Sequence, residues 1–324
     1  MDQLNIIQKR LENELREMNA IIHQALFTSN ELMNQVVSNY LTVKGKQIRP
    51  LMVILSAGLF GNVNTHVLHA GAALEMLHNA SLIHDDVVDE TSLRRGKPTV
   101  NSIWGNHIAV LVGDYFVSNA LAAGIRTNNI EIISALSDLG KELSIGEMHQ
   151  ICNAREHHFD EESYLSMIHK KTASLFINCA KMGAEAAGAK PEEYAPLVKY
   201  AELLGLCFQI KDDIFDYSDS QEIGKPTGND LREGKVTMPL LYALNTAPEE
   251  AAQPMKELLR RGNLSNEEIA TLIEFAKANG GIEYAYRRMA EMQEEGEQYL
   301  AAYPDSDWKQ SFRDLFSFII SRHK

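Results

Sequence analysis

The stretch AGAALEMLHNASLIHDDVVD, residues 70–89, is the most informative part of this sequence. Its apolar residues recur at the spacing of one helix face, with Leu74, Leu77 and Ser81 in a single stripe. The stretch therefore predicts an apolar helix that ends in a cluster of aspartates. A second helix of this kind is predicted near residues 197–217, and we expect both helices to be central to the fold.

The rest of the chain indicates an all-α fold. Most segments repeat their apolar residues with the helical period, and turn signals such as Gly61-Asn62 and Gly262-Asn263 separate them. The sequence has no internal repeat with a period of roughly 20–50 residues and no long Ser/Gly/Pro linker. We therefore expect residues 1–324 to form one domain of ten or more helices.

The composition is that of an acidic globular protein. Lys and Arg number 31 and Asp and Glu 44, so the formal net charge is −13, which disfavours nucleic acid as a partner. Three scattered cysteines, Cys152, Cys179 and Cys207, indicate free thiols in a reducing cytosol. Residues 1–16 lack the apolar core of a signal peptide, and apolar stretches such as residues 51–60 are shorter than the ~20 residues that span a bilayer. We expect a cytoplasmic protein without a transmembrane segment.

The first aspartate motif consists of Asp85, Asp86 and Asp89. Residues three and four apart share a helix face, so the three carboxylates can point into one space, where they repel one another unless a cation lies between them. Oxygen ligands without His or Cys favour magnesium over zinc. Taken alone, the motif is also compatible with a solvated acidic helix end.

The second aspartate motif, Asp212, Asp213 and Asp216, repeats this spacing at the end of another apolar helix. Two such motifs on core helices are hard to explain as surface decoration. Magnesium usually reaches a protein through a few carboxylates and the phosphates of a substrate. The pair of motifs therefore predicts a diphosphate held by magnesium ions between two acidic helices.

Basic residues lie near both motifs. Arg offers a planar fork for phosphate oxygens, and Lys offers a mobile point charge. Each basic residue alone could be a solvated helix end, but together, on an acidic chain, they favour phosphate binding. They are Arg94, Arg95 and Lys97 after the first motif, Lys225 and Lys235 after the second, Lys44, Lys46 and Arg49 upstream, and Lys170 and Lys171 between the motifs.

Both motifs and their flanks resemble those of the all-trans polyprenyl diphosphate synthases. The matching blocks are HDDVVD (84–89), LRRGKPT (93–99), QIKDDIFD (209–216) and GKP (224–226), within a resemblance that runs from about residue 44 to residue 235. The chain is particularly similar to component 2 of the bacterial two-component heptaprenyl or hexaprenyl diphosphate synthases. The resemblance implies the isoprenoid synthase fold, a single large helical bundle around a central cavity.

The resemblance also implies a role for each matching residue. The six aspartates would hold Mg²⁺, about three ions per active site, on an allylic diphosphate. The residues implied to bind this diphosphate are Arg94, Lys171, Thr172, Gln209, Lys225 and Lys235. The residues implied to bind isopentenyl diphosphate are Lys46, Arg49, His78 and Arg95, joined by Arg322 and Lys324. The implied catalytic set is Asp85, Asp86, Asp89, Arg94, Lys171, Asp212, Asp213 and Lys225.

The upstream block departs from the family pattern Gly-Gly-Lys-Arg-x-Arg-Pro. Lys44 stands at the first Gly and Gln47 at the first Arg, whereas Lys46 and Arg49 are retained. We therefore expect an altered loop with an unchanged function. Two further residues, Glu147 and Gln150, share a helical face and could serve either the cavity or the structure.

The implied reaction is a chain elongation. The metal-bound allylic diphosphate leaves, the double bond of isopentenyl diphosphate attacks the allylic cation, and the released diphosphate takes the proton. In this family an aromatic residue four or five positions before the first motif stops growth. Here Ser81 and Ala80 are small, with Leu77 and Met76 one turn deeper. We expect products of six to eight isoprene units for quinone side chains, made from farnesyl diphosphate.

Two other functions are compatible with parts of this pattern. A class I terpene cyclase also uses an Asp-Asp-x-x-Asp motif, but its second metal motif is normally of the Asn/Asp-Ser/Thr-Glu kind. A non-catalytic regulatory subunit usually lacks aspartates from one motif, and both motifs are complete here. The resemblance implies a homodimer or a heteromer with a small regulatory subunit.

Overall fold

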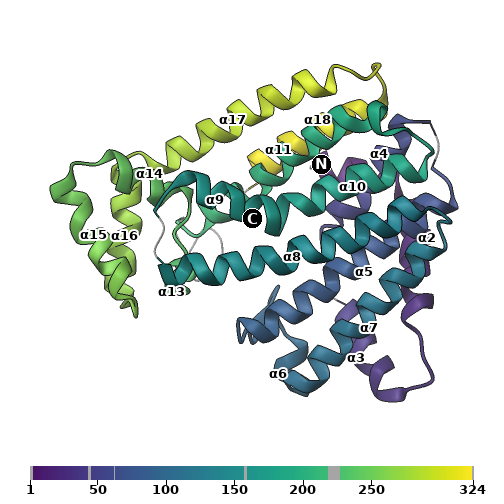
Figure 1. Ribbon diagram of the computed structural model, residues 1–324, viewed down its shortest axis with the longest axis horizontal. Helices are drawn as coiled ribbons and strands as arrows, with labels where there is room; N and C mark the ends of the chain where they lie inside the picture. The colour runs from purple at the N-terminus through teal and green to yellow at the C-terminus, as the bar shows by residue number, and fades with distance from the viewer. Residues whose placement is uncertain (1–2, 43–44, 62, 157–158, 218–226, 323–324) are drawn as a thin grey trace. The chain divides into compact units, whose positions relative to one another are not determined.

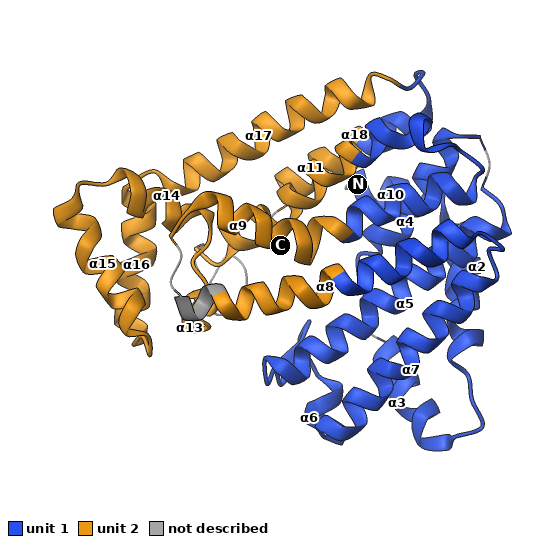
Figure 2. Ribbon diagram, viewed as in Figure 1, with its two compact units in different colours: residues 1–141, 175–198, 303–312 blue, residues 142–174, 199–302, 313–324 orange. Residues whose placement is uncertain are grey.

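A computed structural model describes residues 3–42, 45–61, 63–156, 159–217 and 227–322. The described residues are almost entirely helical, with more than ten helices, which confirms the predicted all-α fold (Figure 1). The chain divides into two compact units (Figure 2). Unit 1 contains residues 1–141, 175–198 and 303–312, and unit 2 contains residues 142–174, 199–302 and 313–324.

Unit 1 is built around the predicted first helix. Its elements are α1 (Gln3–Arg10), α2 (Glu12–Leu26), α3 (Glu31–Leu41), α4 (Ile48–Leu59), α5 (Thr65–Val88), α6 (Val100–Trp104) and α7 (Asn106–Ile125), with part of α8 (Ile130–Glu156), most of α10 (Ser174–Ala186), and the first turns of α11 (Pro191–Phe215) and α18 (Asp307–Ser321). Helix α5 begins at a cap, because the Asn64 side chain accepts a hydrogen bond from Val67 N, and it packs against α2, α4 and α7. The first motif thus lies at the end of a core helix, as predicted.

A two-stranded hairpin follows α5 and was not predicted. Strands β1 (Leu93–Arg94) and β2 (Lys97–Pro98) pair in antiparallel fashion. The two residues between them, Arg95 and Gly96, have φ angles of 52° and 74°, as a tight two-residue hairpin turn requires. The hairpin folds Arg94 back toward the end of α5.

Helix α7 is a longer apolar segment than those considered in the sequence. It has 20 residues, and its most apolar 18-residue window has a mean hydropathy of 1.6, so it is long and apolar enough to cross a membrane by length and composition alone, as core helices can also be. The sequence analysis overlooked this helix because polar residues such as Asp114, Ser118 and Asn119 interrupt its apolar runs. In the structure α7 packs along α5, and 39% of its most apolar window is buried inside unit 1.

Unit 2 contains the rest of α11, the predicted second helix. Its other elements are the end of α8, α9 (Glu161–Ile168), the π-helical turn η1 (His169–Ala173), α13 (Asn229–Arg232), α14 (Met238–Thr246), α15 (Glu249–Arg261), α16 (Asn266–Ala278), α17 (Gly281–Leu300) and the end of α18. Buried side chains such as Leu240, Leu244 and Leu272 form an apolar cluster that joins α14 to α16. This cluster continues to Tyr217, immediately after the second motif, and so anchors the end of α11.

Candidate active site

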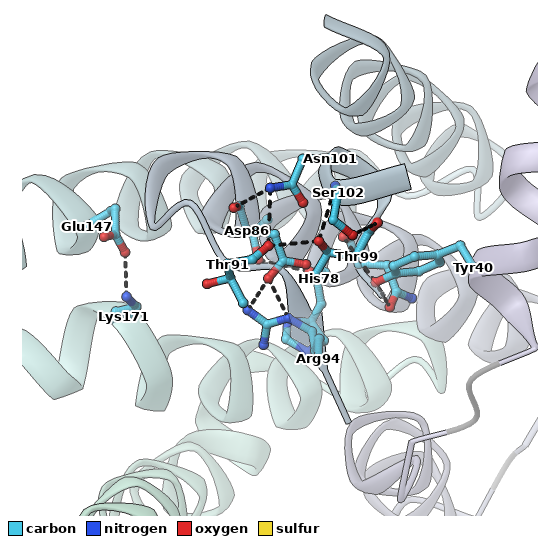
Figure 3. Close-up of polar contacts among 12 residues, drawn as sticks. Tyr40, His78, Asp86, Thr91, Arg94, Thr99, Asn101, Ser102, Glu147 and Lys171 are labelled. Carbon is cyan, nitrogen blue, oxygen red and sulfur yellow. Dashed lines mark hydrogen bonds and ion pairs between the residues drawn. The ribbon is translucent and has the colours of Figure 1, made fainter. Parts of the chain in front are cut away.

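The first motif places its three carboxylates differently. Asp86 is 3% exposed and accepts hydrogen bonds from Arg94 Nε and Nη2 at 2.8 and 2.7 Å (Figure 3). Asp85 is half-buried, and Asp89 is exposed at the C-cap of α5. Burial raises the pKa of Asp86, and the Arg94 guanidinium opposes that rise. Arg94 therefore supplies the positive charge beside Asp86 that a metal ion would otherwise supply.

The backbone around Asp86 is fixed by the segment that carries Arg94. The Asp86 carbonyl oxygen accepts hydrogen bonds from Thr91 N at 2.9 Å and from Asn101 Nδ2 at 3.0 Å. Thr99 Oγ1 donates to the Thr91 carbonyl oxygen at 2.7 Å (Figure 3). All of these partners lie within 15 residues of Asp86, so the first motif is held by its own sequence neighbourhood.

The upstream loop contacts the hairpin. A Cβ atom at Gly45 would lie 2.6 Å from Arg95 Nη1, so the Arg95 guanidinium lies directly against the loop backbone. Gln47 adopts a left-handed conformation with φ 50°, and its side-chain amide donates to Asn19 Oδ1 at 3.0 Å. This second contact gives a physical reason why Gln is tolerated where the family pattern has Arg. Lys44 lies outside the described residues.

His78 is buried near two arginines. Burial lowers the pKa of His78 well below its usual value, and the charges of Arg49 and Arg95 lower it further. His78 is therefore neutral at pH 7 and contributes a hydrogen-bonding group rather than a positive charge. The Arg49 guanidinium lies 5.5 Å from the centre of the Phe176 ring, an arrangement that holds it in place.

The four residues implied in product length lie on α5 as predicted, but they are not equivalent. Met76 and Ala80 are fully buried, with Ala80 only 1% exposed, and Leu77 is buried at 9% exposure. Ser81 is half-buried and donates a hydrogen bond to the His78 carbonyl oxygen at 2.9 Å. Because Leu77, Ser81 and Asp85 are spaced by four residues, they form one row beneath the first motif.

The second motif is held by distant parts of the chain. Asp213 is buried and accepts hydrogen bonds from the Tyr164 hydroxyl at 2.5 Å and from Gln209 Nε2 at 2.7 Å. Gln209 Oε1 in turn accepts from Thr172 Oγ1 at 2.7 Å, which links α11 to the π-helical turn. Burial raises the pKa of Asp213, the two hydrogen bonds lower it, and the neighbouring Asp212 and Asp216 raise it.

Asp216 caps the short helix α13. Its two carboxylate oxygens accept hydrogen bonds from the backbone N–H groups of Asn229 and Asp230, both at 3.0 Å. This contact brings Asp230 beside Asp213 and Asp216, and burial together with these two carboxylates raises the pKa of Asp230 well above its usual value. The structure thus adds a fourth acid to the second motif.

Lys171 is held by two side chains of α8. Lys171 Nζ donates to Glu147 Oε2 at 2.5 Å (Figure 3) and to Gln150 Oε1 at 2.8 Å. Gln150 lines the cavity of unit 2 together with Lys171, and Glu147 supports Lys171 through their ion pair. Gly146 permits the approach, because a Cβ atom there would lie 2.9 Å from the Lys171 backbone nitrogen. Such π-helical turns often occur at functional sites.

A cavity of about 170 Å³ lies inside unit 2, and Tyr164, Lys171 and Thr172 are among the residues that line it. Its wall contains two cations, Lys171 and Lys235, together with Gln209, Asp213 and Asp230. Lys235 also pairs with Glu233. A small cavity that combines lysines with buried carboxylates can accept a polyanion together with a hard cation.

Asp212 belongs to a different face of α11. Its Oδ1 accepts an ion-paired hydrogen bond from Arg322 Nη2 at 2.7 Å. The resemblance implies that Arg322 binds isopentenyl diphosphate, and in the structure its side chain pairs with the second motif. Lys225 and Lys324 lie outside the described residues.

The hydrogen-bond partners of the aspartates and the chemistry of their oxygens show whether these residues fit a metal ion. Within the described ranges, no three His, Cys, Asp or Glu side chains are gathered as they would be around a metal ion. Protein donors engage the carboxylates of Asp86, Asp212, Asp213 and Asp216. The donor set nevertheless fits magnesium, because it consists of oxygens alone and the buried acids repel one another.

Two important residues escaped the sequence analysis. Tyr164 is 3% exposed and lies 49 residues before its partner Asp213, so no local pattern connects them. Asp230 was detectable in principle, because the sequence Gly228-Asn229-Asp230 is a helix-start signal five residues before Lys235. Neither residue belongs to an Asp-Asp-x-x-Asp pattern.

Two curated relatives match most of the chain. Octaprenyl diphosphate synthase of Escherichia coli is 33% identical over 323 residues and is covered over 99% of both chains. Heptaprenyl diphosphate synthase component 2 of Bacillus subtilis is 34% identical over 284 residues, which are 87% of this chain and 77% of that protein.

Solved structures share the fold. A decaprenyl diphosphate synthase from Rhodobacter capsulatus superposes with a TM-score of 0.93 at 30% identity, over 99% of each chain. A geranylgeranyl pyrophosphate synthase from Bacteroides thetaiotaomicron superposes with a TM-score of 0.86 at 40% identity, over 99% of this chain and all of the other. These matches confirm the isoprenoid synthase fold.

A family match covers most of the chain. The sequence model of the Polyprenyl synthetase family matches residues 30–276, a range that includes both aspartate motifs, Lys171 and the Gly228–Lys235 segment. The chain therefore belongs to the polyprenyl synthetase family, the all-trans polyprenyl diphosphate synthases, and is a prenyltransferase.

Proposed function

We propose that the chain is a Mg²⁺-dependent synthase, active as one domain in the cytoplasm, that extends an allylic diphosphate with successive molecules of isopentenyl diphosphate. The observation that carries this proposal is the cavity of unit 2, where Lys171 and Lys235 share one wall with Gln209 and Asp213. Two lysines supply charge for diphosphate oxygens, and the carboxylates supply the oxygen ligands that magnesium prefers.

The protein residues have distinct tasks in this reaction. The aspartates of the two motifs would hold about three divalent ions, which neutralise the charge that develops on the leaving diphosphate. Lys171 exchanges Glu147 and Gln150 for diphosphate oxygens, and Thr172, Lys225 and Lys235 would bind the same diphosphate. Arg94 likewise leaves Asp86 and binds the diphosphate. The bound diphosphate offers the Arg94 guanidinium a second anion beside the Asp86 carboxylate.

A second substrate site supports the attacking step. Arg49, Arg95 and Lys46 would bind isopentenyl diphosphate, with neutral His78 as a hydrogen-bonding neighbour. The C–O bond of the allylic substrate breaks, the isopentenyl double bond forms the new C–C bond, and the released diphosphate accepts the proton that leaves. Holding both substrates together replaces a random encounter by a positioned one.

Two small residues of α5 support a long product. Ala80 and Ser81 leave no aromatic barrier before the first motif, while Met76 and Leu77 lie one turn deeper as a later floor. We therefore propose products of six to eight isoprene units, grown from farnesyl diphosphate for a quinone side chain. Ala80→Phe or Ser81→Phe should shorten the product to farnesyl or geranylgeranyl length, whereas Ser137→Phe on the exposed face of α8 should not.

Association with a second chain is part of the proposal. Val110, Leu111, Leu121 and Ile125 of α7 are exposed apolar side chains, each at least 41% exposed, and such patches mark interaction surfaces. They support a homodimer, or a heteromer with a small regulatory subunit. Light scattering of Leu111→Glu beside the wild type tests the contact, and an unchanged mass would exclude this surface.

The deciding experiment supplies farnesyl diphosphate, labelled isopentenyl diphosphate and Mg²⁺, and separates the products by chain length. Long linear diphosphates are the expected result. Hydrocarbons would instead indicate a cyclase. No turnover by the chain alone would indicate a regulatory subunit or a missing partner, and adding a small partner subunit would separate these two outcomes.

A further inference from the structure

Arg322 engages the second motif from outside it. It follows α18, and its side chain is 6% exposed. Besides the ion pair with Asp212 Oδ1 at 2.7 Å, Arg322 Nη2 donates to the Phe208 carbonyl oxygen at 2.9 Å. The guanidinium carbon lies 4.3 Å from the centre of the Phe208 ring and 5.3 Å from that of Phe215.

All three partners of Arg322 belong to one face of α11. Phe208, Asp212 and Phe215 are spaced by four and three residues, which places them in one row on a helix. Two aromatic rings therefore flank the Asp212 carboxylate, and the guanidinium lies over both. A planar guanidinium can stack on such rings as well as attract them through its charge, whereas the Lys ammonium is a point charge.

Asp212 differs from its two neighbours in the kind of partner it has. Neutral donors bind Asp213 and Asp216, namely the Tyr164 hydroxyl, the Gln209 amide and two backbone N–H groups. A cation binds Asp212. The Asp212 side chain is also 40% exposed, so a dissolved metal ion can reach the carboxylate that Arg322 holds.

Because Arg322 is buried, losing its partner, the Asp212 carboxylate, would be energetically unfavourable. A buried guanidinium depends on a paired carboxylate, because an unpaired buried charge is strongly unfavourable. Arg322 Nε is already buried without a hydrogen-bond partner in the described part of the chain. A metal ion that draws Asp212 away would therefore leave Arg322 poorly satisfied.

We propose that Arg322 is a positioning residue that holds Asp212 in the metal-free chain and competes with the divalent ion for this carboxylate. The inference rests on the proposed function, in which Asp212 is a metal ligand. The segment after α18 then sets the metal affinity of the second motif, and metal binding frees Arg322 to donate to another oxygen anion. Competition between Arg322 and the metal ion would explain why Asp212, a metal ligand in the proposed function, is paired with an arginine here.

The test is a titration of the full chain with Mn²⁺, without diphosphate, in which electron paramagnetic resonance reports the free ion. Arg322→Gln keeps a hydrogen-bonding side chain but removes the charge. It should bind Mn²⁺ about tenfold more tightly than the wild type, the factor expected when a charged hydrogen bond no longer competes. Arg322→Lys keeps the charge but loses the planar stacking, and should fall between the two.

Arg313→Gln is the matched control. Arg313 lies on α18, the helix that Arg322 follows, and pairs with Glu297 at 2.9 Å, so Arg313→Gln removes an arginine whose ion pair lies outside the second motif. Mn²⁺ affinity should then equal that of the wild type. Thermal unfolding of all variants separates a stability effect from the metal effect, because a purely structural role would lower stability and leave Mn²⁺ binding unchanged or weaker.

Asp212→Asn distinguishes the two levels of the proposal. If Asp212→Asn weakens Mn²⁺ binding while Arg322→Gln leaves it unchanged, the competition is wrong and the metal role of Asp212 stands. If neither variant changes binding, Asp212 is not a metal ligand and that part of the proposed function fails. Equal affinity in wild type and Arg322→Gln, or no measurable binding in both, overturns the inference about Arg322.

Discussion

The first and second aspartate motifs have the same spacing but are held in different ways. Asp86 of the first motif is fixed by Arg94 and Asn101, both within 15 residues along the chain. The second motif is fixed by residues that are up to 110 positions away, from Tyr164 to Arg322. The same spacing of aspartates can thus rest on a local hairpin in one place and on long-range packing in another.

The largest expected effect comes from removing a carboxylate of either motif. Asp85→Ala and Asp212→Ala should each lower kcat by roughly 10³-fold or more, because each removes a ligand that stabilises the leaving diphosphate. The helices should remain intact by circular dichroism. Asp138→Asn, an exposed aspartate of α8, is the control. Near-normal turnover with unchanged magnesium dependence would show that the motif in question is not a metal site.

The hairpin should divide the two substrates between two adjacent arginines. Arg95→Ala and His78→Ala should raise KM for isopentenyl diphosphate, and Arg94→Ala should raise KM mainly for the allylic substrate, each by about 10- to 100-fold as for a lost charged hydrogen bond. Steady-state kinetics with each substrate varied in turn measures the split. If every variant raised both KM values equally, the assignment of Arg94 to the allylic substrate and of Arg95 to isopentenyl diphosphate would be wrong.

Tyr164→Phe examines the long-range support of the second motif. The change removes the hydroxyl that donates to Asp213 and should lower metal affinity by about tenfold, as is usual for the loss of a group that orients a ligand. Tyr284→Phe is the matched control, because Tyr284 donates an equally short hydrogen bond to Glu161 elsewhere in unit 2. If both variants behave alike, Tyr164 has a structural role only.

Substitutions at three glycines should show the smallest effects, and they compare the backbone contacts of the two regions. A Cβ atom at Gly146 meets the Lys171 backbone, so Gly146→Ala should destabilise the fold by about 1–3 kcal/mol. A Cβ atom at Gly45 meets the end of the Arg95 side chain, which can move, so Gly45→Ala should cost less stability. Gly140→Ala on α8, where space is open, should stabilise by about 0.5–1 kcal/mol. Thermal unfolding ranks the three, and a tolerated Gly146→Ala would contradict the close approach.

The contrast between the motifs also shows what the sequence can predict. Helical periodicity and the aspartate spacing were enough for α5, α11 and both motifs, because these features are local. The hairpin was missed, although Arg95-Gly96 is a turn signal, because two-residue strands have no periodicity. The partners Tyr164 and Arg322 could not be found, since they meet α11 only through the tertiary fold. The neutrality of His78 likewise follows from burial, which the residue type does not reveal.

The most direct test of the account counts the metal ions bound in the presence of inorganic diphosphate. Wild-type protein, Asp85→Asn and Asp212→Asn are each titrated with Mn²⁺ at saturating diphosphate, and bound ions are measured by equilibrium dialysis. The account predicts about three ions per chain in the wild type and the loss of at least one in each variant, because both motifs supply oxygen ligands. A full complement of ions in either variant would contradict the claim that both motifs hold the same metal-bound diphosphate.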